Sequence, residues 1–202
     1  MVTPRVIVLA TTNPGKLREV LAVLDVAGAR LQSLSDFPAH PEPVEDGTTF
    51  AANAALKARY YSQMTNHWAL ADDSGLEVDA LDRAPGILSA RYAGTPGDDQ
   101  ANNAKLVQAL AGVPDDRRTA RFRCAVALAD GQTILATAEG VIEGQIIDHP
   151  RGSNGFGYDP HFLVPELGLT TAELSPQEKN RRSHRGQALR VILPKIAALV
   201  DS

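Results

Sequence analysis

The sequence predicts an α/β fold in which helices flank a mixed β-sheet. Early in the chain, a short β-branched strand directly precedes an amphipathic helix, which is the order of a parallel α/β unit. The middle of the chain instead alternates apolar and polar residues on both sides of an Asp-Gly dipeptide, as in an antiparallel hairpin. The two patterns together predict a sheet with parallel and antiparallel strands.

The first half of the chain interleaves predicted strands and helices. Apolar residues recur at i, i+3, i+4 and i+7 from Leu17, which predicts a helix that stops at Gly28. Another helix is predicted over residues 50–63, with Thr48 or Thr49 as its cap. The predicted elements of this half are strands at 5–10, 68–71 and 76–80 and helices that begin at Leu17, Phe50 and Asp98 or Asp99.

The second half is predicted to form a hairpin, a glycine-rich loop and terminal helices. Asp130-Gly131 supplies the turn between two alternating stretches. Ser175 and Glu178 match a capping box, and Pro194 predicts a kink in the last helix. The predicted elements are strands at 120–128 and 133–146, a loop at 151–160 and helices that begin at 176 and 186.

The length indicates one domain over residues 1–202, or two closely joined lobes, rather than two independent domains. No apolar run approaches the about 18 residues that a membrane-spanning helix needs, and no signal peptide is recognisable. The single cysteine, Cys124, lies in an alternating apolar pattern and is interpreted as a buried thiol rather than a nucleophile. We therefore expect a cytoplasmic protein without a membrane partner.

The charge of the chain is slightly acidic and unevenly distributed. A formal net charge of −4 disfavours a protein that wraps nucleic acid, because such proteins carry a broad basic surface. Carboxylates gather early and basic residues gather late, which suits either a metal site facing a polyphosphate or two solvated faces. The two groups are Glu42, Glu45, Asp46, Asp72 and Asp73, and Lys179, Arg181, Arg182, His184, Arg185 and Arg190.

The polar loop between the first strand and the first helix is a candidate anion site. Backbone N–H groups and the helix dipole favour an anion at such a turn, and Lys16 adds a full positive charge. The loop is not a Walker A motif, because Leu17 stands where a metal-binding Ser or Thr would be. An ordinary turn with an exposed lysine is the alternative. The candidate residues are Thr11, Thr12, Asn13, Pro14, Gly15 and Lys16.

Asp72 and Asp73 form a candidate magnesium site at the end of a predicted buried strand. Adjacent carboxylates raise each other's pKa unless a cation relieves their repulsion, and oxygen ligands suit Mg²⁺. Glu45, in a separate loop, is a candidate third ligand. The alternative is a solvent-facing turn after the strand.

Two later motifs supply candidate substrate-binding residues. Phe156 and Tyr158 are flanked by glycines, so their rings could stack on a base or could plug the loop into the core. Lys179 could bind phosphate, and His184 and Arg185 could reach base oxygens, although a His-Arg pair at a helix start is also a common exposed cap.

Six motifs in order resemble those of the inosine triphosphate pyrophosphatases, the non-canonical purine nucleoside triphosphate pyrophosphatases. The resemblance runs from Ala10 to Leu189. The motifs are Thr-Thr-Asn-Pro-Gly-Lys, Glu-Asp-Gly-Thr-Thr-Phe-Ala-Ala-Asn-Ala, Ala-Asp-Asp-Ser-Gly-Leu, Ala-Pro-Gly-Ile-Leu-Ser-Ala-Arg-Tyr-Ala-Gly, Gly-Phe-Gly-Tyr-Asp-Pro and Ser-His-Arg-Gly-Gln-Ala-Leu. Thr12 is a small departure, since many members carry glycine there.

The resemblance implies an elongated mixed sheet, two lobes around a central nucleotide cleft, and a homodimer. It implies that residues 11–16 hold the triphosphate and that Glu45 and Asp73 bind Mg²⁺, with Asp72 beside them. Asp73 is the proton acceptor that the family assigns. The remaining implied nucleotide-site residues are Ser74, Phe156, Gly157, Tyr158, Asp159, Lys179, His184 and Arg185.

The activity implied is hydrolysis of ITP, dITP and XTP to the nucleoside monophosphate and pyrophosphate. The division of labour between Asp72 and Asp73 stays open, because one aspartate would have to serve as both metal ligand and base. One alternative, a nucleotide-binding regulator without turnover, has no need of Asp72, Asp73 and Glu45. The other is a related pyrophosphatase family that acts on pyrimidine or methylated nucleotides, and the motif at residues 183–186 favours the purine family.

Overall fold

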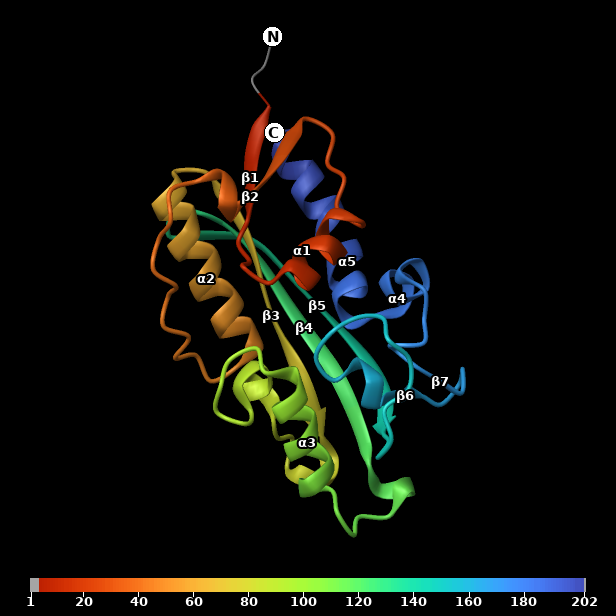
Figure 1. Ribbon diagram of the computed structural model, residues 1–202. Helices are drawn as coiled ribbons and strands as arrows, with labels where there is room; N and C mark the ends of the chain where they lie inside the picture. The colour runs from red at the N-terminus through yellow and green to blue at the C-terminus, as the bar shows by residue number, and fades with distance from the viewer. Residues whose placement is uncertain (1–3, 202) are drawn as a thin grey trace. The chain divides into compact units, whose positions relative to one another are not determined.

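The computed structural model describes residues 4–201 and has the predicted α/β class (Figure 1). Seven strands in the described residues form one mixed sheet in the order β2-β1-β3-β4-β5-β6-β7. Strand β1 pairs in parallel with β2 and β3, and β6 pairs antiparallel with β5 and β7. The strands are β1 (Arg5–Leu9), β2 (Ala29–Ser33), β3 (Trp68–Val78), β4 (Thr119–Asp130), β5 (Thr133–Ile146), β6 (Phe162–Val164) and β7 (Leu169–Thr170).

The helices begin close to their predicted starts. They are α1 (Pro14–Leu21), α2 (Phe50–Thr65), α3 (Asp99–Ala109), α4 (Pro176–Arg182) and α5 (His184–Val200). Thr49 and Ser175 cap α2 and α4 with their side chains, because each hydroxyl accepts a backbone N–H of the first turn. Helix α5 continues through Pro194. Short 3₁₀ turns at 34–36, 79–81, 86–91, 115–117 and 159–161 complete the chain.

Three predictions of local structure are corrected. Helix α1 ends at Leu21, before the predicted stop at Gly28. Strands β2, β6 and β7 are absent from the predictions, because each is short and without clear alternation. Residues 72–75 do not form a loop but continue β3, because neighbouring side chains neutralise the two carboxylates inside the sheet.

The described chain divides into two compact units, which are described separately. Unit 1 consists of residues 1–73, 124–140 and 185–202, and unit 2 consists of residues 74–123 and 141–184. Strands β3, β4 and β5 each contribute residues to both units.

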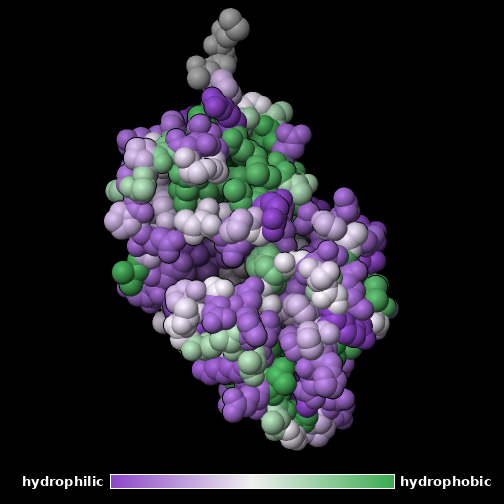
Figure 2. All heavy atoms as spheres, viewed as in Figure 1, coloured by the Kyte–Doolittle hydropathy of each residue, from purple (hydrophilic) through white to green (hydrophobic). Residues whose placement is uncertain are grey.

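The core of unit 1 packs α1 and α5 against the sheet. Its buried residues include Ile7 and Leu9 of β1, Leu70 of β3, and Leu189 and Ile192 of α5. Helix α2 buries a separate stripe of residues at helical spacing, and Figure 1 shows α2 on the other side of the strands from α1 and α5. Figure 2 shows hydrophobic residues gathered on the surface in the upper part of the view. Leu21 of α1 and Val191 of α5 are each about half exposed.

The core of unit 2 is smaller and combines α3 with the parts of β3, β4 and β5 that belong to unit 2. Its buried members are Leu76, Val78, Leu106, Leu110, Ala120, Phe122, Ile142, Ile146, Tyr158, Phe162 and Val164. Gly144 brings β5 close to Phe162, since a Cβ on this glycine would lie 2.5 Å from the ring. Each unit therefore has its own apolar core.

Candidate active site

The loop between β1 and α1 is held by its own side chains. The Asn13 side chain accepts the N–H groups of Gly15 (2.8 Å) and Lys16 (3.0 Å), so it caps α1 directly before Pro14. Thr11 Oγ1 accepts the N–H of Asn13. Three of the N–H groups expected to face an anion are thus bonded inside the loop, and Lys16 remains as its cationic side chain.

Asp72 and Asp73 lie just beyond the carboxyl end of β1. The register pairs Leu9 with Leu70, and the N–H of Ala10 donates to Leu70 at 2.8 Å before the chain leaves the sheet. In open parallel sheets, ligand sites lie beyond the carboxyl ends of strands. Because successive side chains in a strand point to opposite faces, the two carboxylates are directed to different sides of the sheet.

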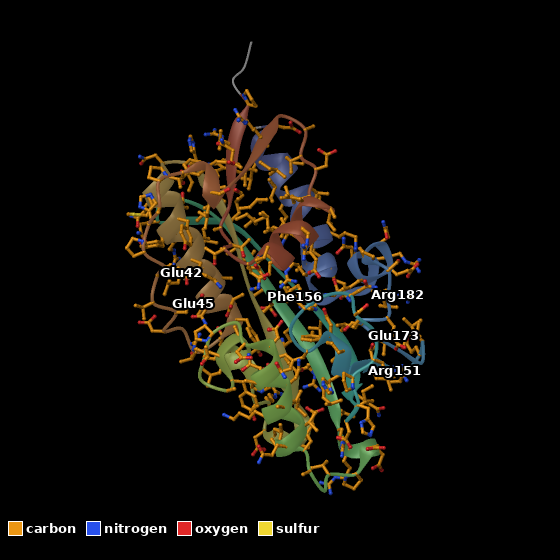
Figure 3. All side chains as sticks on the ribbon, viewed as in Figure 1. Glu42, Glu45, Arg151, Phe156, Glu173 and Arg182 are labelled. Carbon is orange, nitrogen blue, oxygen red and sulfur yellow. The ribbon has the colours of Figure 1, made fainter. Side chains whose placement is uncertain are left out.

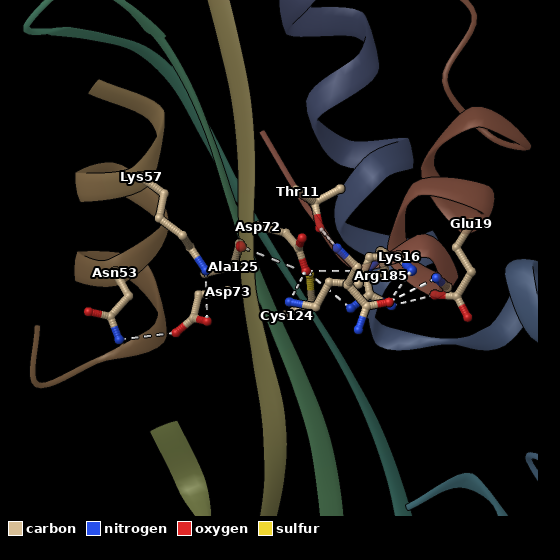
Figure 4. A network of polar contacts seen from close by, with 12 residues as sticks. Thr11, Lys16, Glu19, Asn53, Lys57, Asp72, Asp73, Cys124, Ala125 and Arg185 are labelled. Atoms are coloured by element: carbon tan, nitrogen blue, oxygen red, sulfur yellow. Dashed lines mark hydrogen bonds and ion pairs between the residues drawn. The ribbon is translucent and has the colours of Figure 1, made fainter. Parts of the chain in front are cut away.

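Asp73 faces α2, where it contacts Lys57 and Asn53 (Figure 4), and Lys57 also contacts Glu45. Lys57 Nζ lies 3.1 Å from Asp73 Oδ1 and 3.1 Å from Glu45 Oε1. Asn53 Nδ2 donates to Asp73 Oδ2 at 3.2 Å. Glu45 reaches this group from the loop before α2, which Figure 3 also shows. Glu45 and Asp73 therefore lie near each other, on either side of one lysine.

Lys57 and Asn53 were missed when the sequence was read alone. They lie one turn apart on the stripe of α2 that also buries Phe50, Ala54 and Tyr61. Polar residues at core-facing positions of an amphipathic helix need buried partners, and this pattern in the sequence could have identified both residues.

Burial raises the pKa of Asp73 and outweighs the opposing charges of Lys57 and Lys16. Burial lowers the pKa of Lys57, but Asp73, Asp72 and Glu45 outweigh it and raise the pKa above its ordinary value. The lysine is therefore cationic at neutral pH, and Asp73 has become the more basic of the two adjacent aspartates.

Asp72 faces α1 and α5, where Lys16 Nζ lies 3.1 Å from its Oδ2 (Figure 4). Arg185 also donates to this oxygen through Nε (3.2 Å) and Nη2 (3.1 Å), and it pairs with Glu19 through Nη1. Burial raises the pKa of Asp72, but Lys16 and Arg185 outweigh it and hold the pKa well below its usual range. Asp72 is therefore a buried anion engaged by two cations.

The expected group of three carboxylates is corrected by this arrangement. Asp72 does not lie beside Glu45 and Asp73, because strand alternation directs it to Lys16 and Arg185. Among residues 4–201, no three His, Cys, Asp or Glu side chains are grouped to hold a metal ion. Arg185, expected to reach a base, is fully buried against Asp72 and Glu19.

Glu45 and Asp73 nevertheless fit a magnesium ion. Their oxygens share one cationic neighbour, so they lie no farther apart than twice the 3.1 Å that separates each from Lys57 Nζ. Mg²⁺ in phosphate-transfer sites takes one or two protein carboxylates and fills its other positions with water and phosphate oxygens. The donor chemistry therefore matches this ion without a third carboxylate.

Cys124 lies in β4 beside Asp72, with Sγ 4.0 Å from Asp72 Oδ2. Burial, reinforced by Asp72, raises the pKa of Cys124 to about 12. The predicted burial of this thiol is confirmed.

The second set of candidate residues lies in unit 2 and centres on Asp159. One oxygen of Asp159 accepts the N–H of Phe156 (2.8 Å) and pairs with Lys179 Nζ (2.5 Å). Its other oxygen accepts the hydroxyl of Thr171 at 2.8 Å. Gly155 has a φ of +79°, and a Cβ there would lie 2.0 Å from Asp159 Oδ2. Only glycine therefore fits this turn.

The two aromatic residues of the loop have different environments. Tyr158 is buried in the core of unit 2, and its hydroxyl donates to the Ser89 carbonyl at 2.8 Å. Tyr158 therefore plugs the loop into the core, and its ring is not a stacking surface. Phe156 is partly exposed, and Lys179 Nζ lies 4.7 Å from the centre of its ring.

The remaining predicted residues of unit 2 are Ser74, Gly157 and His184. Ser74 follows Asp73 in β3 and is partly exposed. The N–H of Gly157 donates to Asp99 Oδ2 at 2.6 Å. His184 is buried at the start of α5 and stacks on Phe122, with ring centres 4.9 Å apart. The buried position of His184 excludes a simple exposed cap.

Comparison with known proteins identifies the family. The Ham1 family matches residues 7–195, which is nearly the whole chain. This chain belongs to the Ham1 family. The dITP/XTP pyrophosphatase of Desulforamulus reducens is 54% identical over 184 residues, covering 91% of this chain and 92% of that protein. The dITP/XTP pyrophosphatase of Geobacter sulfurreducens is 53% identical, covering 92% and 94%.

Solved Ham1 structures have the same fold. A Ham1 protein from Coxiella burnetii superposes with a TM-score of 0.86 at 42% identity, covering 98% of this chain and all of that one. A nucleoside-triphosphatase, dITP/XTP pyrophosphatase, from Mycobacterium abscessus has a TM-score of 0.76 at 46% identity, covering 95% and 99%. The predicted family and mixed α/β sheet are confirmed. In the part of the chain that the structure describes, no helix is long and apolar enough to span a membrane.

Proposed function

We propose that this Ham1 protein hydrolyses the purine nucleoside triphosphates ITP, dITP and XTP to the nucleoside monophosphate and pyrophosphate, and so clears the nucleotide pool of non-canonical bases. The observation that carries the proposal is the group of Glu45, Lys57 and Asp73 beyond the carboxyl end of β1, beside the loop that bears Lys16. The relatives named dITP/XTP pyrophosphatase support the substrate class.

Glu45 and Asp73 are the proposed magnesium ligands. A bound Mg²⁺ would supply charge neutralisation at the phosphate oxygens and would lower the pKa of an attacking water. The two carboxylates contribute the protein's oxygen donors, and Lys57 holds them together until a substrate competes for its ammonium group. The residues lie on α2, β3 and the loop between β2 and α2, so their backbone positions are set by the unit 1 fold.

Asp73 rather than Asp72 is the proposed base. Lys16 and Arg185 both engage Asp72 Oδ2, whereas Asp73 has one cationic neighbour, Lys57, and a neutral donor, Asn53. The water oxygen attacks the α-phosphorus, the bond from that phosphorus to the bridging oxygen of the β-phosphate breaks, and Asp73 accepts the water proton. Pyrophosphate leaves with the electron pair of the broken bond.

Lys16 and Lys57 are the proposed phosphate-binding cations of unit 1. Both ammonium groups are fixed by carboxylates, Lys16 by Asp72 and Lys57 by Asp73 and Glu45. Cations positioned in advance stabilise the charge that develops on the leaving pyrophosphate without reorganisation at the moment of reaction. The rest of the loop at residues 11–14 contributes the turn that presents Lys16.

The unit 2 residues are proposed to contribute to base recognition. Phe156 supplies a partly exposed ring, and the Asp159–Lys179 pair orders the backbone on which it stands. Ser74 and His184, next to Asp73 and Arg185 in sequence, complete the proposed set. A base with a 6-oxo acceptor is then selected over adenine, because the 6-amino group of adenine would leave buried donors of the site without an acceptor. By analogy with the resembling family we also propose a cytoplasmic homodimer.

A substrate panel tests the proposal. Purified protein with Mg²⁺ is expected to release pyrophosphate from ITP, dITP and XTP and to release far less from ATP, while EDTA abolishes release. Asp73→Asn should lower kcat by at least about a hundredfold, because a general base contributes about 10²–10⁴. Equal rates on ATP and ITP would overturn the selectivity, and full activity of Asp73→Asn would overturn the assigned base.

A further inference from the structure

Asn53 contacts two separate parts of the proposed metal site. Its Nδ2 donates to Asp73 Oδ2 at 3.2 Å, and its Oδ1 accepts the N–H of Gly47 at 2.9 Å (Asp73 contact in Figure 4). Gly47 lies two residues after Glu45, in the loop before α2. One side chain therefore ties β3, which carries Asp73, to the loop that carries Glu45.

The orientation of the Asn53 amide follows from its partners. A backbone N–H can only donate, so the atom facing Gly47 must be the carbonyl oxygen. The opposite NH₂ then faces Asp73, where a carboxylate can only accept. Reversing the amide would place two donors together and two acceptors together. The arrangement thus requires asparagine chemistry and not merely a polar side chain.

Asn53 is also held tightly in place. It is completely buried, and its own N–H bonds to the Thr49 carbonyl at 3.1 Å in the first turn of α2. A Cβ on Gly47 would lie 2.4 Å from Asn53 Oδ1, so the loop approaches the amide as closely as a residue without a side chain permits. The helix is therefore the fixed element, and the loop is positioned against it.

Asn53 and Lys57 divide the two oxygens of Asp73 between them. Lys57 Nζ contacts Oδ1 and carries a charge, whereas Asn53 contacts Oδ2 and is neutral. A neutral donor orients a carboxylate without cancelling its charge, so the anion stays available to a cation. This division distinguishes the role of Asn53 from that of the lysine one turn later.

We propose that Asn53 is the positioning residue that sets the magnesium site, by fixing the Asp73 carboxylate and the Glu45 loop relative to each other. The inference rests on the proposed function, because it takes Glu45 and Asp73 as the ligands. Removing a hydrogen bond that orients a metal ligand typically weakens metal affinity by about 10- to 100-fold.

The test measures Mn²⁺ binding without nucleotide, from the electron paramagnetic resonance signal of the free ion, so that it does not depend on turnover. Asn53→Ala and Asn53→Leu both remove the amide, and Leu leaves less empty volume. Gly47→Ala disturbs the loop from the other side and keeps the asparagine. Each variant is expected to bind Mn²⁺ at least tenfold more weakly than wild type. Thermal melting establishes that each one is folded.

Asn102 provides a matched control in unit 2. It is 2% exposed, and it also joins its helix to the preceding segment through bonds to the Ala93 N–H (2.7 Å) and the Ala90 carbonyl (3.3 Å). Asn102→Ala should keep its Mn²⁺ affinity within twofold of wild type. An equal loss in Asn102→Ala would show a general effect of losing a buried amide and would overturn the proposal.

The outcomes separate this inference from the proposed function. Folded Asn53 variants that bind Mn²⁺ like wild type overturn the positioning role and leave the activity untouched. If both Asn53 variants fail to fold, Gly47→Ala decides, and normal Mn²⁺ binding by it overturns the role. A wild-type protein that binds no Mn²⁺ overturns the assigned ligands and this inference together.

Discussion

Two adjacent aspartates in β3 have opposite electrostatic surroundings. The pKa of Asp72 is lowered and that of Asp73 is raised, although burial alone raises both. The difference comes from the number of cations at each oxygen, since Lys16 and Arg185 converge on Asp72. Asp72 is therefore suited to a structural role, in which its negative charge holds two cations. Asp73 is suited to a role in which its carboxylate exchanges one partner for another.

Replacing Asp72 should cost more stability than replacing an exposed aspartate. Asp72→Asn leaves the buried Arg185 with less compensating charge, so we expect the free energy of unfolding to fall by about 3–5 kcal/mol. Asp25→Asn, at an exposed position, should change it by less than about 0.5 kcal/mol. Urea unfolding at neutral pH measures both. Similar values for the two variants would contradict the assigned buried network.

At the scale of elements, helix α2 and the loop at residues 155–159 each position several polar groups of the candidate site. Helix α2 places Asn53 and Lys57 one turn apart on its buried side, so both reach Asp73. In the loop, Asp159 gathers the Phe156 N–H and the Lys179 ammonium group on one oxygen. In both cases a single element orders several polar groups at once.

The glycines of the loop should differ in their tolerance of a side chain. Gly155→Ala would place a Cβ against Asp159 Oδ2, whereas a Cβ at Gly157 meets nothing within 4 Å. Both have positive φ, at +79° and +61°, so each substitution carries about 1–2 kcal/mol of backbone strain. We expect Gly155→Ala to raise KM for ITP at least tenfold and Gly157→Ala clearly less, as steady-state kinetics would show. Equal effects would contradict the close packing at Gly155.

At the scale of the whole molecule, two apolar cores support the sheet separately. The core of unit 1 joins β1, β3, β4 and β5 to α1 and α5, and the core of unit 2 joins the other halves of the long strands to α3. The proposed catalytic carboxylates belong to unit 1. Stability of that core and integrity of the site are therefore coupled.

Helix α5 offers a matched pair to measure the contribution of the unit 1 core. Leu189 is fully buried and Val191, two residues later, is 48% exposed. Leu189→Ala should lower the free energy of unfolding by about 2–5 kcal/mol, because it leaves a cavity. Val191→Ala should lower it by less than about 1 kcal/mol. Thermal or urea unfolding provides the comparison, and equal losses would mean that α5 is not packed as described.

Local patterns along the chain were enough to predict the mixed α/β sheet, the starts of α2 and α4, the buried thiol of Cys124 and the family. These features depend on residues close together in sequence, such as Thr49 with Ala52 or Ser175 with Glu178. Periodicity and capping are short-range effects, so a sequence displays them directly.

The partners of Asp72 and Asp73 could be learned only from the tertiary structure. Asp72 meets Arg185 across 113 positions of sequence and Asp73 meets Asn53 across 20, and no local pattern reports such contacts. The continuation of β3 through both aspartates also depends on contacts between residues distant in sequence. Burying a charge is costly unless other residues compensate it. The strand conformation of this segment therefore depends on Lys16, Lys57 and Arg185, which are distant in sequence and contact the two carboxylates.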